Sequence, residues 1–151
     1  MRHAIPAIVV FLAATAVPVC ASGYGVEIID QHSIDALAAK ARQAPPREQC
    51  FLYAELVHQV TELSVQRYAA GDVEKASELL RQVQELTRRI HPSASNDNKR
   101  LKNTEILLRR AAFRLSGLLR ASSFEDQPLV AQTLAQVNQA QSEAMMQLFS
   151  K

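Results

Sequence analysis

The fold is most clearly encoded in residues 101–118, which read LKNTEILLRRAAFRLSGL. Apolar or small residues recur here at alternating steps of three and four positions, the spacing that aligns side chains along one side of an α-helix. They are Leu101, Thr104, Leu108, Ala111, Leu115 and Leu118. A helix with such a seam packs it against other helices, so we expect bundle packing with Leu108 and Leu115 in the interior.

Helical spacing continues on both sides of this seam, and prolines and glycines mark where the helices begin and end. Pro46 suits the first turn of a helix, Gly71 accepts the left-handed conformation that ends one, and His91-Pro92 stops another. The predicted helices run from Asp30 or Ser33 to Gln43, from Pro46 to Ala70, from the cap Asp72 to about Ile90, from Asp97 to Ala121 and from Gln127 to Phe149. Short connections force consecutive long helices to run antiparallel. The sequence therefore predicts an all-α fold, an antiparallel bundle of four long helices plus a short N-terminal helix.

The first 21 residues have the pattern of a secretory signal peptide. Arg2 and His3 form a cationic start, an apolar run extends from Ala4 to Val19, and a small-residue site ends at Ala21. The run is shorter than the roughly 20 residues that span a bilayer, which favours a cleaved signal over an anchor. We expect cleavage near Ala21, and a protein exported to the periplasm or the exterior with no transmembrane span left after signal removal. Lipidation at Cys20 is the alternative.

The predicted domain organisation is simple: a signal peptide at 1–21, an extended leader at 22–29 and a single helical-bundle domain at 30–151. Loss of Arg2 with the signal leaves sixteen of the 17 Lys and Arg residues against 15 Asp and Glu residues. This near-neutral balance argues against a nucleic-acid binder, because such proteins usually carry a large basic excess.

Residues 55–90 resemble a single tetratricopeptide repeat. The similarity lies in Leu63-Ser64, Tyr68, Gly71-Asp72, Ala76, Leu80 and Val83. This resemblance implies a helix–turn–helix unit that takes part in binding peptides or partner proteins. Segments 50–58, 70–72 and 99–105 are also similar to small exported bacterial proteins of unassigned function, which implies a shared helical fold and no activity.

Two features could carry metal or thiol chemistry, and each has a simpler explanation. Glu55 and His58 have the Glu-x-x-His spacing of di-metal bundles, but those sites need two such motifs and further glutamates. Helical geometry places Glu55, His58 and Glu62 opposite the apolar side, so we expect a solvated face and no metal or other cofactor. Cys50, left alone once the signal is removed, is expected to be a buried apolar residue, since free cysteine is usually interior. Bridging of two chains through Cys50 stays open.

The helix at 97–121 carries an unusual charge pattern. Beyond its cap residue Asp97, seven cations stand against one acid, Glu105, and Ile106 and Phe113 emerge on the basic side, away from the seam. Such a surface can bind an acidic partner helix or an anionic membrane. Alternatively, the short first helix covers Ile106 and Phe113, and the arginines pair with Glu62, Glu78 or Glu85 of neighbouring helices. The candidate surface comprises Lys102, Ile106, Arg109, Arg110, Phe113 and Arg120.

The sequence thus favours an exported, non-catalytic interaction or structural protein. Its expected partner is an acidic protein or the anionic surface of the cell envelope, and a homodimer is left open. The alternative is a metal- or thiol-dependent sensor or enzyme centred on Cys50 or on Glu55 and His58.

Overall fold

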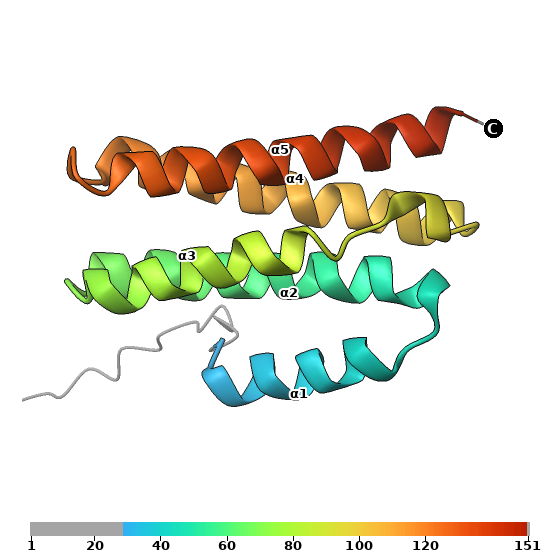
Figure 1. Ribbon diagram of the computed structural model, residues 1–151, viewed down its shortest axis with the longest axis horizontal. Coiled ribbons are helices and arrows are strands. Elements are labelled where there is room, and N and C mark those ends of the chain that lie inside the picture. The colour runs from blue at the N-terminus through green and yellow to red at the C-terminus, as the bar shows by residue number, and fades with distance from the viewer. Residues whose placement is uncertain (1–28, 151) are drawn as a thin grey trace, which may run out of the picture.

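The computed structural model describes residues 29–150, and this part of the chain is helical throughout (Figure 1). Its elements are α1 (Gln31–Gln43), α2 (Pro46–Ala69), α3 (Val73–Thr87), the short 3₁₀ helix η1 (Pro92–Ala94), α4 (Asn98–Ala121) and α5 (Gln127–Phe149). The all-α prediction is confirmed, with no strand among the described residues. The predicted signal peptide, and the leader up to residue 28, lie outside those residues and stay predictions.

The turn between α2 and α3 forms where the sequence predicts it. Gly71 has a φ of 84°, in the left-handed region that glycine adopts without steric cost. The N–H of Gly71 donates to the carbonyl of Tyr68 and the N–H of Asp72 donates to that of Arg67, each at 3.0 Å, the paired bonds of a Schellman motif. The Asp72 carboxylate then accepts a hydrogen bond from the N–H of Lys75 and caps α3.

Helix α3 ends earlier than predicted, at Thr87 instead of Ile90. The residue before a proline is biased away from helical geometry, and His91 before Pro92 has a φ of −121° and a ψ of 88°. The preceding turn tightens as a result, with the N–H of Arg89 donating to Leu86 and that of Ile90 to Thr87. Ile90 nevertheless stays in the core, with 4% of its surface exposed.

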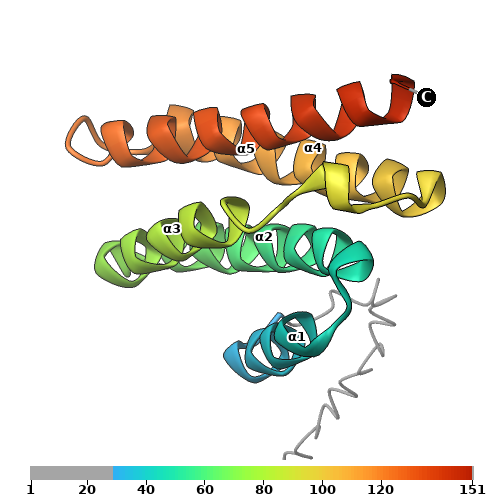
Figure 2. The same ribbon diagram turned by 45° about the vertical axis from the view of Figure 1, so that its right-hand side comes forward.

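The four long helices form two hairpins, α2–α3 and α4–α5, which lie one on the other (Figures 1 and 2). Consecutive helices run antiparallel, as predicted. Across the two hairpins, α2 runs parallel to α4, because Glu48 pairs with Arg100 and Glu62 with Arg114, both at an interval of 52 residues. In the same way α3 lies alongside α5, where the Gln84 side chain donates to Thr133 Oγ1 at 2.9 Å.

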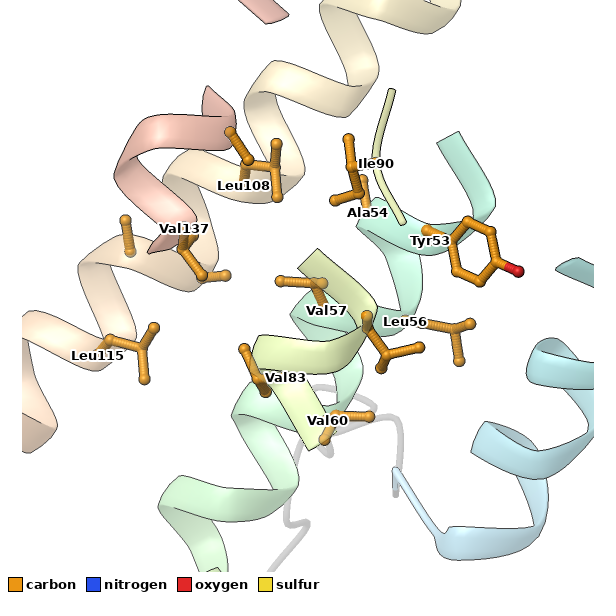
Figure 3. Close-up of a cluster of buried hydrophobic side chains, with 14 of the residues drawn as sticks. Tyr53, Ala54, Leu56, Val57, Val60, Val83, Ile90, Leu108, Leu115 and Val137 are labelled. Carbon is orange, nitrogen blue, oxygen red and sulfur yellow. The ribbon is translucent and has the colours of Figure 1, made fainter. Parts of the chain in front are cut away.

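The core lies between the hairpins, where side chains of all four long helices point toward one another (Figure 3). Val57, Val83 and Val137 come from three of these helices, and Leu108 and Leu115 of the α4 seam are fully buried among them. The predicted interior position of the seam is therefore confirmed. Helix α1 packs on α2, on the side away from α4 and α5 (Figures 1 and 2), and buries Ile34 and Ala41 there.

Candidate interaction surface

The predicted surface on α4 is largely exposed. Of its six residues, Ile106 is half-buried, and the side chains of the other five are open to solvent. Phe113 is 72% exposed, which is unusual for an aromatic side chain in the middle of a long helix. We call this surface, formed by Lys102, Ile106, Arg109, Arg110, Phe113 and Arg120, the basic face.

The expectation that α1 covers Phe113 is wrong. Helix α1 follows the side of α2 that faces away from α4, and its apolar residues Ile34 and Ala41 are buried there. Beside Phe113 the surface is lined by residues of α2 and α4, so α1 does not cover this side chain. Among the described residues, Phe113 therefore has little apolar cover.

The alternative, that the arginines of α4 form salt bridges within the protein, is correct for some of them and not for others. Arg114 Nε lies 2.8 Å from a Glu62 oxygen, as predicted. By contrast, Glu78 pairs with Lys75 of its own helix, and Glu85 pairs with Arg88, the residue that follows α3. Arg109 lies 3.7 Å from Glu105 within α4. By contrast, Lys102, Arg110 and Arg120 make no ion pair with a carboxylate of residues 29–150.

A groove runs beside the basic face, between the parallel helices α2 and α4. At one end it has a volume of about 380 Å³ and is lined by side chains of both helices. These are His58 and Glu62 of α2 with Arg109, Arg110, Phe113 and Arg114 of α4. We call this part the basic end.

Phe113 and Arg114 also line the next part of the groove, a mainly apolar pocket of about 200 Å³. Its other lining residues are Val65, Tyr68 and Ala69 of α2 with Gly117, Leu118, Arg120 and Ala121 of α4. We call it the apolar pocket. The two parts adjoin at Phe113 and Arg114, which line both, so they follow one another along the helices.

Tyr68 fixes the far end of the groove. Its hydroxyl donates to Asp126 Oδ2 at 3.1 Å and accepts from the N–H of Ser123 at 2.9 Å. Ser123 Oγ also donates to Asp126 Oδ2. This network ties the C-terminal end of α2 to the turn between α4 and α5, and so holds the walls of the apolar pocket in place.

The predicted solvated face of α2 is wrong for His58 and Glu62, because both are half-buried against α4. Burial lowers the pKa of His58, and the charges of Arg110 and Arg114 act in the same direction, against the opposing effect of Glu62. His58 therefore favours its neutral form in the folded protein. Its Nδ1 is buried without a hydrogen-bond partner in the described part of the chain.

The Glu-x-x-His motif stands by itself in the fold. Among residues 29–150, no group of three or more His, Cys, Asp or Glu side chains is placed to hold a metal ion. Glu55 is half-buried on α2, and the nearest charged neighbours of His58 include two arginines, which repel a cation. The surroundings of His58 thus suit an anion better than a metal.

Cys50 is buried, as predicted, with 3% of its surface exposed. Removal from water raises the pKa of its thiol, because burial disfavours the charged thiolate. The burial of the thiol and its raised pKa both oppose nucleophilic or redox chemistry at Cys50, because that chemistry needs an accessible thiolate.

We predict that Cys50 reacts slowly in the folded protein. Alkylation of a chain of residues 22–151 by iodoacetamide at pH 8 should be at least about tenfold slower in buffer than in concentrated urea, because unfolding exposes the thiol and removes the cause of its raised pKa. Intact-mass spectrometry over time measures the rate. Equal rates in the two conditions would show that the thiol is accessible in the native state.

Sequence reasoning did not identify the α2 side of the groove. It recognised the cations and Phe113 of α4 because they depart from the seam, but Val65, Tyr68 and Ala69 look like ordinary helix residues. Gly117 of α4 does not mark a close approach of a neighbouring helix, since a Cβ at this position would meet no atom within 4 Å.

Comparisons of the whole chain with protein-family models, with curated proteins and with solved structures gave no match. The two resemblances drawn from the sequence therefore remain predictions. Within residues 29–150, no helix combines the length and the apolar character that crossing a membrane requires.

Proposed function

We propose that the protein is an exported, non-catalytic interaction module whose basic face binds an acidic partner protein. The observation that carries the proposal is the exposure of Phe113 on a face where Arg110 and Arg120 have no carboxylate partner in the described chain. Arginine and aromatic residues dominate the binding energy of protein interfaces. Like charges on one helix also destabilise it, and an acidic partner would relieve that repulsion.

Several further observations support the proposal. The signal-like residues 1–21 favour export. The burial and raised pKa of Cys50 disfavour the thiol-dependent alternative. The helical hairpin α2–α3, which resembles a tetratricopeptide repeat in sequence, fits a role in binding partner proteins.

An anionic lipid surface is the second candidate. It is favoured by the same exposed phenylalanine, since apolar residues interleaved with cations are typical of helices that lie in a membrane interface. The two candidates can be told apart by competition, because anionic lipid vesicles would displace a bound partner from the basic face only if that face also binds lipid.

We expect the variant Arg109→Gln/Arg110→Gln/Arg120→Gln to lose partner binding while it stays folded. These side chains are exposed, so the melting temperature should change by no more than about 2 °C. Mature protein (residues 22–151) immobilised on a support should retain an acidic protein from envelope extract at about 50 mM salt. The variant at the same salt concentration, and the wild type at about 300 mM salt, should each retain at least about fivefold less of that protein.

The matched control is Arg42→Gln/Arg67→Gln/Arg81→Gln, which removes three exposed cations from α1, α2 and α3 and leaves the basic face intact. It should retain the partner as the wild type does. Equal loss in both triple variants would mean that net charge alone governs binding and would contradict the proposal. Displacement of the partner by phosphatidylglycerol vesicles, with direct vesicle binding, would favour the lipid surface instead.

A further inference from the structure

We infer that the groove between α2 and α4 is a two-part docking site for an acidic peptide segment of the partner. Carboxylates of the segment would meet the basic end, and one apolar side chain would enter the apolar pocket beside Gly117. This inference rests on the proposed function and extends it from a charged face to a defined site with a defined ligand chemistry.

The first argument is the charge of the basic end. Arg109, Arg110 and Arg114 project into it from α4, and the only carboxylate in its lining is Glu62, which Arg114 already binds. Arg110 has no carboxylate partner among residues 29–150. A carboxylate placed here would gain charge-assisted hydrogen bonds from guanidinium groups.

The second argument is independent and comes from Gly117. Glycine is the least favourable residue in a helix apart from proline, because it loses the most conformational freedom. Close packing within the protein does not require it, since an added Cβ would meet no atom within 4 Å. The space that Gly117 leaves instead widens the apolar pocket, between Val65 and Ala69 on one side and Leu118 and Ala121 on the other.

The size of the site favours a peptide over a lipid. A pocket of about 200 Å³ has room for one aliphatic or aromatic side chain but not for a whole acyl chain. His58 and Val65, which line the two parts of the groove, are half-buried, so a flat membrane surface would contact them less than a narrow segment would. A narrow peptide segment can lie along the depression and contact both parts.

The geometry also sets the spacing of the ligand. Arg110 and Gly117 are two helical turns apart, about 10 Å along α4 at the standard rise. A helical segment would therefore present its acidic and apolar side chains about seven residues apart, and an extended one about three residues apart.

The test uses a synthetic helical peptide in an alanine-rich background, with one leucine about seven residues from a pair of glutamates. Fluorescence anisotropy with the mature chain (residues 22–151) should show at least about tenfold tighter binding than for the same peptide with alanine in place of leucine. The variant Gly117→Leu should fill the pocket and weaken binding of the leucine peptide at least about tenfold, while binding of the alanine peptide changes little.

Two control variants separate the parts of the site. Gly117→Ala adds only a methyl group in open space, so the affinity for the leucine peptide should change less than about threefold. Arg110→Gln should weaken the binding of both peptides. Added salt should reduce the difference in affinity between this variant and the wild type. Gly117→Leu should melt no lower than the wild type, because leucine favours helix and its Cβ would meet no atom within 4 Å.

Equal affinity for the two peptides, or no effect of Gly117→Leu on the leucine peptide, would overturn the docking site. The proposed function would survive that result if the triple arginine variant still lost its envelope partner. Phosphatidylglycerol vesicles that bind with the same dependence on Gly117 would overturn the peptide as the occupant and identify a lipid instead.

Discussion

Truncation of Leu108 to alanine is expected to lower the free energy of unfolding by about 2–5 kcal/mol, the range found for large-to-small changes in protein cores. Leu108 is fully buried between the two hairpins, so alanine would lose its apolar contacts and leave a cavity (Figure 3). Urea unfolding of a chain of residues 22–151, followed by circular dichroism, measures the change.

Phe113→Ala is the matched control on the same helix. It removes a larger side chain, but one that is 72% exposed, so the free energy of unfolding should change by less than about 0.5 kcal/mol. Comparable losses in the two variants would mean that Phe113 is covered by part of the folded protein. A loss below about 0.5 kcal/mol for Leu108→Ala would mean that the seam is not the core.

The contrast between these two residues shows what periodicity can predict. Leu108 follows the alternating steps of three and four along α4, and Phe113 departs from them. The sequence therefore placed Leu108 in the interior but left open whether the first helix covers Phe113, and the structure buries Leu108 and exposes Phe113. Helix boundaries were also predictable where glycine or proline fixes the backbone, as at Gly71 and Pro46.

Periodicity could not predict which helix lies beside which. It indicates the side of α4 that is buried, but not that α2, which precedes it by 52 residues, would lie parallel to it. The groove depends on that pairing, and so its α2 side was missed. His58 and Glu62 were misjudged for the same reason: α2 contacts α1, α3 and α4, which leaves little of its surface fully solvated.

The early end of α3 has a local cause that a helix-by-helix interpretation missed. Ile90 fits the apolar stripe of α3 and is buried, yet it lies beyond the last helical residue. The apolar stripe indicates which residues are buried, not whether their backbone is helical. It therefore extends to Ile90, through the turn that Pro92 imposes on the backbone.

The contact between α2 and α3 yields the second large prediction. Ala76 is fully buried, and its carbonyl accepts a hydrogen bond from Ser64 Oγ at 3.0 Å, so the two helices meet here through small side chains. Ala76→Leu would force additional atoms into this contact and separate the helices, which should lower the free energy of unfolding by about 1–3 kcal/mol. Urea unfolding of a chain of residues 22–151 measures this loss.

The control is Arg81→Leu on the exposed side of α3, which places the same side chain on the same helix without a neighbour to displace. Its free energy of unfolding should change by less than about 0.5 kcal/mol, because leucine and arginine have similar helix propensities. If Ala76→Leu were equally well tolerated, the hairpin could widen without loss, and the small residues at Ser64 and Ala76 would not set the distance between α2 and α3. A clear difference between the two variants would instead identify close approach at Ala76 as the feature that keeps the hairpin, and with it the α2 wall of the groove, in place.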